Sequence, residues 1–309
     1  MTPSANNTQT VLTGWLSALL ITALLLGGCD TDFNPFQESD FHFSVFGFLD
    51  AAADSQFIRI TPVRDSIALA PGRPIDATVT LENLISGRKI TFQDSLFSFK
   101  AGFTERLAYN FWSPERVEHE TAYRLSVTRS DGAASTVSFT TPPDWPDPEL
   151  LLPPGASFAA IRINNVERLA DLRIVFRFRS PEAPEGSRGT LTVSFLDRVA
   201  ELAGGLGLVF RPYNEFFSQV PGCPIVEEAQ VLIAAAGPEW PDFLAIDEET
   251  LALADVVTNV ENGVGFVGGV SRKTLVWDDL RAVLAGSQTL CAQCIAAVPD
   301  PRFCFGSLH

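Results

Sequence analysis

Histidine is scarce in this sequence, with 3 in 309 residues. His42 lies in a phenylalanine-rich stretch, His119 lies just before a strand-like segment, and His309 is the last residue, so we expect structural roles for His42 and His119. The nucleophile elbow Gly-x-Ser-x-Gly and the zinc motif His-Glu-x-x-His are both missing. The sequence therefore predicts a non-enzymatic protein, with an extracytoplasmic hydrolase built on paired carboxylates as the weaker alternative.

Basic residues and long apolar runs are also few. The 22 Lys and Arg are outnumbered by 37 Asp and Glu, which leaves a net charge of −15. Such a chain lacks the cations that neutralise a phosphate backbone, so nucleic acid is excluded as an expected partner. A hydrophobic content of 46% excludes a disordered chain, and a single apolar run excludes a polytopic membrane protein.

That apolar run, 11–26, ends in Leu26-Gly27-Gly28-Cys29 and resembles a lipoprotein signal peptide. The run is shorter than a membrane span of about 20 residues, and small residues before the cysteine suit the signal peptidase. Residues 1–28 contain no Lys or Arg, which departs from the usual pattern. The resemblance implies that Cys29 becomes the acylated first residue, so we expect a lipid-anchored protein of the cell envelope, in the outer membrane, with 29–40 as the anchor linker.

Residues 41–141 predict a β-sandwich of the immunoglobulin-like class. Short segments of alternating apolar and polar residues are separated by turn residues: 41–49, 56–63, 75–84, 89–93, 97–103, 108–112, 122–129 and 135–140. Asp131-Gly132 predicts a tight hairpin between the last two segments. Tyr123 occupies the position of a tyrosine corner, and the stretch 121–143 resembles the end of a fibronectin type III domain.

A proline-rich linker, 142–154, separates this domain from a second one at 155–309. Strand-like segments at 158–163, 172–179, 190–195, 207–211 and 229–234 predict a second β-rich domain. Short helices are expected at 238–255 and 278–284, where acidic residues stand at the helix starts. The sequence thus predicts a mainly β protein with two domains and a cysteine-containing C-terminal tail.

The glycine-rich segment 259–269, Asn-Val-Glu-Asn-Gly-Val-Gly-Phe-Val-Gly-Gly, resembles the closing motif of a family of Bacteroidota-type lipoproteins of unknown function (DUF 4249-like). The resemblance implies an envelope role, often alongside a TonB-dependent outer-membrane receptor. Taken by themselves, the glycines indicate close strand packing. A phosphate-binding loop would need a following helix, whereas 266–270 predicts a strand, so we expect no cofactor.

Four cysteines follow the lipidation site: Cys223, Cys291, Cys294 and Cys304. An even number in an exported chain predicts two disulfides, with three possible pairings. A zinc site of Cys291, Cys294, Cys304 and His309 and a Cys-x-x-Cys redox site are the alternatives, and both require reduced thiols. We therefore expect no metal site.

Two sets of side chains are candidates for binding. Arg173, Arg177 and Arg179 alternate with apolar residues and would form a row able to bind carboxylate or sulfate, unless neighbouring acids pair with them. Trp145 and Trp240 are candidate platforms if the protein is a stand-alone carbohydrate- or peptide-binding module. The leading hypothesis is an accessory protein that binds an outer-membrane receptor.

Overall fold

The computed structural model describes residues 41–63, 74–101, 104–154, 157–180, 188–220, 223–241 and 257–286. All of them belong to one compact unit, Asp40–His309. Strands dominate this unit, which confirms the prediction of a mainly β protein. Among the helices in these ranges, none has the length and apolar character needed to cross a membrane.

The first half of the unit is an eight-stranded sandwich. One sheet contains, in order, β1 (Phe43–Asp50), β2 (Gln56–Pro62), β6 (Thr104–Ser113) and β5 (Gln93–Ala101); the other contains β4 (Lys89–Thr91), β3 (Thr78–Asn83), β7 (Ala122–Thr128) and β8 (Ala134–Thr140). Alternate residues such as Val45 and Ile58 pack against Leu81 and Leu125 of the opposite sheet. This strand order is that of an immunoglobulin-like sandwich, as the sequence predicts.

Two local features of this sandwich follow from the sequence. Gly132 adopts a φ of 91° in the hairpin between β7 and β8, a conformation that glycine reaches without steric cost. The buried Tyr123 accepts a hydrogen bond at its phenol oxygen from the backbone N–H of Glu118, at 2.8 Å. The predicted tyrosine corner is therefore present, and burial raises the pKa of Tyr123.

The second half is also a sandwich of two sheets. One contains β12 (Arg188–Ser194), β11 (Leu169–Arg179), β15 (Ile225–Ala236) and part of β16 (Gly263–Val276); the other contains β13 (Ala200–Leu202), β14 (Gly205–Phe210), β10 (Ala159–Asn164) and β9 (Glu149–Leu151). Its core joins apolar residues of both sheets to Phe216 of α2 (Pro212–Phe217) and Leu280 of α4 (Asp278–Gly286). A short 3-10 helix, η1, spans Leu196–Arg198.

The sequence prediction of helices in this half is mixed. The helix expected at 278–284 is confirmed as α4. Helix α2 was not expected, although Pro212 at its first turn and the buried Phe216 and Phe217 are typical of a short amphipathic helix. Most of the helix expected at 238–255 lies outside the described residues.

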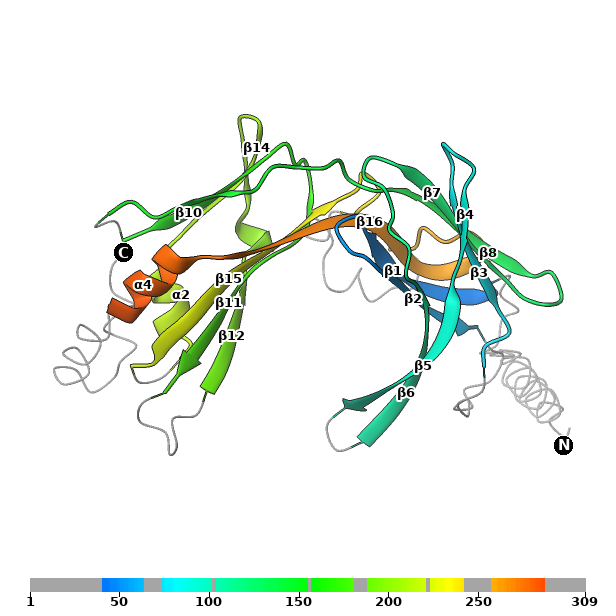
Figure 1. Cartoon of the computed structure of the whole chain (residues 1–309), viewed down its shortest axis with the longest axis horizontal. Coiled ribbons are helices and arrows are strands. Elements are labelled where there is room, and N and C mark those ends of the chain that lie inside the picture. The colour runs from blue at the N-terminus through cyan, green and yellow to red at the C-terminus, as the bar shows by residue number, and fades with distance from the viewer. Residues whose placement is uncertain are drawn as a thin grey trace, which may run out of the picture. The chain divides into compact units, whose positions relative to one another are not determined.

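Strand β16 belongs to both sandwiches (Figure 1). Its residues Gly263 to Val270 pair in parallel with β1, and Val270 to Val276 pair antiparallel with β15. One continuous sheet, β12-β11-β15-β16-β1-β2-β6-β5, therefore runs through the two halves. The sequence places this whole segment in the second domain, whereas the structure gives its first part to the first sandwich as an edge strand.

The glycines of β16 allow this close packing. A Cβ on Gly269 would lie 2.6 Å from the carbonyl oxygen of Thr140 and from Cα of Thr141. Gly265 has a φ of 118°, which L-residues rarely adopt. The segment 259–269 thus serves close strand packing, in agreement with the interpretation based on glycine geometry alone.

Candidate functional site

The three predicted arginines lie on the solvent-facing side of β11. Arg173, Arg177 and Arg179 are exposed, while the nearby Leu172, Ile174 and Phe176 of the same strand are buried in the second core. The period of two residues along a strand produces this division.

Each of these arginines is paired with a carboxylate. Arg173 Nε lies 3.0 Å from Asp171 Oδ2, Arg177 Nη1 lies 2.8 Å from Glu228 Oε2, and Arg179 Nε lies 3.5 Å from Glu227 Oε1. The alternative that the sequence left open, pairing with neighbouring acids, is the observed arrangement. An anionic ligand would have to displace these carboxylates, so the row alone is a weak anion site.

A β-bulge brings both glutamates to this face. Arg177 is opposite Glu228, but the next residue, Phe178, is opposite Val226, which leaves Glu227 as an extra residue in β15. Because a bulge lets two consecutive side chains share one side of a strand, Glu227 and Glu228 both point to solvent.

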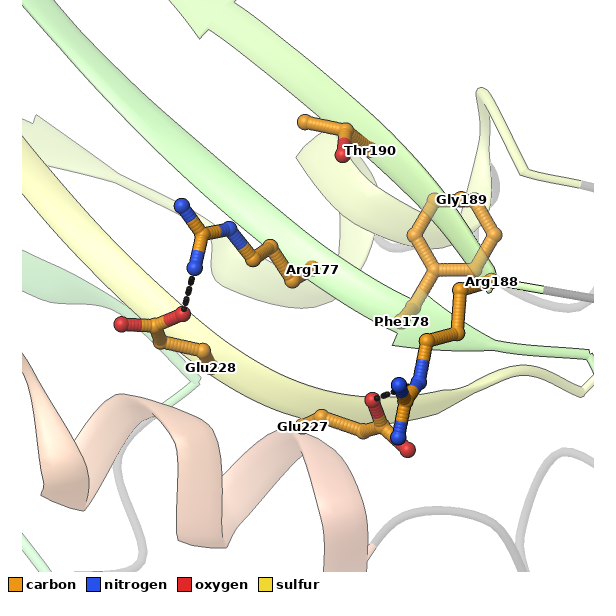
Figure 2. A pocket seen from close by; sticks show the side chains of 7 residues that line it. All are labelled: Arg177, Phe178, Arg188, Gly189, Thr190, Glu227 and Glu228. Atoms are coloured by element: carbon orange, nitrogen blue, oxygen red, sulfur yellow. Dashed lines mark hydrogen bonds and ion pairs between the residues drawn. The ribbon is translucent and has the colours of Figure 1, made fainter.

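These charges surround a shallow pocket of about 380 Å³ (Figure 2). Arg177 extends toward Glu228, and Arg188 of β12 extends toward Glu227, with Nε and Oε2 3.2 Å apart. Phe178 also lines the pocket, and its ring covers Gly189, where a Cβ would collide with it. The two cations and two anions of the lining balance, so the pocket has no preference for one sign of charge.

Burial affects one acid near this row. Partial burial raises the pKa of Asp171, and the guanidinium of Arg173 opposes that shift. A raised carboxyl pKa means that the folded protein holds this proton more tightly than the unfolded chain does.

A second candidate surface lies on the outer side of β1 and β2. Phe46 is 51% exposed, Phe48 is 41% exposed, and Phe57 is 48% exposed. Phe48 and Phe57 are directly opposite each other on the two strands, and Phe46 is opposite Arg59. Directly opposed side chains share one face of a sheet, so the three rings lie on a common surface.

This surface continues onto β16. Phe266 is the parallel partner of Phe46, and its ring meets the edge of Trp240 at a centroid distance of 5.2 Å. The guanidinium carbon of Arg272 lies 4.2 Å from the ring centroid of Phe48, which is within cation–π range. We call Phe46, Phe48, Phe57, Phe266 and Trp240 the aromatic face.

The two tryptophans expected as platforms have different environments. Trp145 is 2% exposed and belongs to the second core, with Lys273 Nζ 5.0 Å from its ring centroid, so its prediction as an exposed platform is wrong. Trp145 is buried because packing its indole ring against the second core is more favourable in free energy than exposing the ring to water. Trp240 is half-buried and belongs to the aromatic face.

The remaining predicted residues are only partly described. Cys223 is half-buried and packs against the second core. Cys29, Cys291, Cys294, Cys304 and His309 lie outside the described residues. Within the described ranges, no three His, Cys, Asp or Glu side chains are grouped closely enough to hold a metal ion.

The first strand carries a sequence signal for the aromatic face. The segment Phe41-His42-Phe43-Ser44-Val45-Phe46-Gly47-Phe48 has apolar residues on both faces of a strand. Phe43 and Val45 are needed for the core, so Phe46 and Phe48 must be on the outer face.

Comparisons with known proteins show no family. No family model matches the chain, and no curated protein matches it. Among solved structures, a cytokine receptor complex has 10% identity and a TM-score of 0.25, covering 62% of this chain and 90% of that chain. The FN1–FN3 domains of chicken CNTN1 have 12% identity and a TM-score of 0.26, covering 75% of this chain and 63% of that chain. The fold assignment above therefore rests on the strand order and pairing of this chain.

Proposed function

We propose that this chain is a lipid-anchored protein of the cell envelope that acts by binding a membrane partner through the aromatic face, without catalysis. The exposure of Phe46, Phe48 and Phe57 on one surface is the observation that carries the proposal. Contiguous apolar side chains on a protein surface are typical of interaction sites, because their contact with water is unfavourable. Burying a phenylalanine side chain contributes about 1.5–3 kcal/mol.

Two arginines beside the aromatic face indicate what kind of partner surface it could bind. Arg272 stacks on the Phe48 ring, and its Nε also lies 3.7 Å from Asp50 Oδ2. These two contacts hold the guanidinium against the aromatic face. Arg59 stands beside Phe46 on the neighbouring strand. A partner surface with apolar side chains and a few carboxylates would complement this combination.

Most of the aromatic face lies few residues after Cys29 in the sequence, which supports the proposal of a partner in the same membrane. If Cys29 is acylated, the linker to Phe43 reaches at most about 50 Å when fully extended. The first two strands, which contribute most of the aromatic face, are then confined close to the bilayer. The family resemblance of segment 259–269 points to a TonB-dependent outer-membrane receptor as this partner.

A second candidate function is a stand-alone carbohydrate- or peptide-binding protein. Trp240 favours it, because its indole ring extends the aromatic face and aromatic rings stack on sugars. Binding of an isolated glycan or peptide that is lost in Trp240→Ala would favour this candidate over a membrane partner.

Affinity purification from detergent-solubilised membranes tests the main proposal. The tagged full chain is compared with Phe46→Ser/Phe48→Ser and with the control Leu202→Ser/Val209→Ser, which changes exposed apolar residues on another sheet. We expect one membrane protein to copurify with the wild type and the control, and to be reduced at least about tenfold with the Phe variant. Equal recovery with all three proteins, or no membrane protein with the wild type, would contradict the proposal.

The anchor is tested separately by the mass of the N-terminal peptide. We expect acylated Cys29 as the first residue of the membrane-bound protein. An unprocessed Met1 would remove the lipid anchor from the account and leave the aromatic face without its membrane context.

A further inference from the structure

A cleft of about 690 Å³ lies where the two sandwiches meet, and its lining shares no residue with the aromatic face or with the arginine row. Its walls come from loops of both halves: Glu120, Pro142 and Pro143 from the first half and the linker, and Asn165, Glu167 and Arg168 from the turn between β10 and β11. Pockets that bind small groups have volumes of about 300–1,000 Å³ and occur preferentially between structural units.

The walls are fixed by backbone hydrogen bonds. The N–H of Glu120 donates to the carbonyl of Pro142 at 3.1 Å, and the N–H of Asn165 donates to the carbonyl of Gly204 at 3.1 Å. Glu120 and Asn165 have φ values of 49° and 59°, a left-handed conformation that is uncommon for residues other than glycine. Strained residues persist only where their surroundings hold them, and these backbone hydrogen bonds hold the two turns that form the walls.

Two charged side chains at the cleft have uncharged hydrogen-bond partners. The guanidinium of Arg168 donates from Nη1 to the carbonyl of Trp240 at 2.8 Å. Glu239, next to the lining residue Pro238, accepts hydrogen bonds from the backbone N–H and the hydroxyl of Thr140, at 2.9 and 2.8 Å.

Glu120 and Glu167 contribute no salt bridge within the described part of the chain. The lining therefore holds two carboxylates, one from each sandwich, against one guanidinium, that of Arg168, so its net charge is negative.

Apolar groups line the cleft together with these carboxylates. Pro142, Pro143, Pro238, Val166 and Ala236 supply the apolar part of the wall. An apolar stem that ends in a cation matches this combination, because the stem packs on the prolines while the cation reaches a carboxylate. The net charge of −15 would also attract such a group from solution.

We propose that this cleft binds a basic side chain, Lys or Arg, presented by an extended peptide segment. The inference does not depend on the lipid anchor or on the aromatic face. It assigns the protein a second binding site, of opposite charge preference to the arginine-edged aromatic face.

The test measures binding of a peptide probe to the full-length protein in detergent. The probe is a fluorescein-labelled Arg-Val-Arg tripeptide amide, and the matched control probe is Gln-Val-Gln. Glu120→Gln and Glu167→Gln remove one charge each without changing side-chain length, and Asp279→Asn removes an exposed charge on α4 as the control variant.

We expect fluorescence anisotropy to show binding of the basic probe only. Each cleft variant should weaken it about threefold and the double variant about tenfold, while Asp279→Asn binds as the wild type does. Unfolding midpoints of the variants should match the wild type, because both glutamates are exposed. Equal binding of both probes, full binding by the double variant, or no binding at millimolar probe would overturn the inference.

Discussion

The phenol oxygen of Tyr123 accepts a hydrogen bond from the backbone N–H of Glu118, five residues earlier in the chain, at 2.8 Å. This bond joins the start of β7 to the loop that precedes it. Tyr123 is buried, with 2% of its surface exposed. Tyr123→Phe leaves the ring in place and removes the hydroxyl, with this bond and the hydroxyl's hydrogen bond with Asn83. We expect a loss of about 1–2 kcal/mol in the free energy of unfolding, measured by denaturant titration. Tyr213→Phe, on a half-buried ring stacked against Phe217, is the control and should change stability less; equal losses would argue against the corner.

Close packing of β16 against the end of β8 gives a second prediction. A Cβ at residue 269 would lie 2.6 Å from the backbone of Thr140 and Thr141, which cannot move without disturbing both sandwiches. We expect Gly269→Ala to reduce the free energy of unfolding by about 1–3 kcal/mol, the cost of overpacking. Gly286→Ala is the matched control, since its Cβ meets open space at the end of α4. If Gly269→Ala left the free energy of unfolding unchanged, β16 could move away from β8 without a loss of stability, and the prediction would be wrong.

The sequence predicted the first sandwich better than the second. Period-two alternation, Asp131-Gly132 and Tyr123 are local signals, and each of them corresponds to an observed strand, hairpin or corner. The double membership of β16 is not a local property, because the parallel pairing of Gly263 with Phe43 joins residues far apart in the chain. Register between such distant segments depends on the assembled cores, which no single window of sequence contains.

The candidate sites show the same division. The exposure of the arginines on β11 could be predicted from the alternation of apolar and polar residues. Their pairing with Glu227 and Glu228 depends on a bulge for which the sequence has no signal. Trp145 is in the opposite situation, since it is a candidate exposed platform in the sequence and the second core buries it. The cleft between the two sandwiches is formed by turns from both halves, so the two carboxylates that line it could be recognised only in the folded chain.

Titration of Asp171 provides a third prediction. Burial raises its pKa, while Arg173 and Arg272 oppose the shift. Removing the nearer guanidinium in Arg173→Gln should therefore raise the pKa of Asp171 further, as observed by carboxyl carbon chemical shifts against pH. Because a raised carboxyl pKa favours the protonated folded state, the contribution of Asp171 to stability is present at low pH and is lost as pH rises through the folded pKa. A pKa below the ordinary value, or one that falls in Arg173→Gln, would show that burial is not the dominant influence.

The cysteines provide a fourth prediction. If two disulfides form, Cys223, Cys291, Cys294 and Cys304 should resist alkylation in the unfolded, unreduced protein and react after reduction. The control is the same protein treated with a chelator in place of the reductant. Alkylation after chelation alone would indicate a metal site at the C-terminal cysteines, and alkylation without either treatment would indicate free thiols.

The role of the aromatic face is tested most directly by photo-crosslinking in intact envelopes. Benzoylphenylalanine is placed at Phe48, or at the exposed control position Val209 on β14, in the full-length protein. Binding through the aromatic face predicts a light-dependent adduct with one membrane protein from position 48 and none from position 209. No protein adduct from position 48, or the same adducts from both positions, would contradict it.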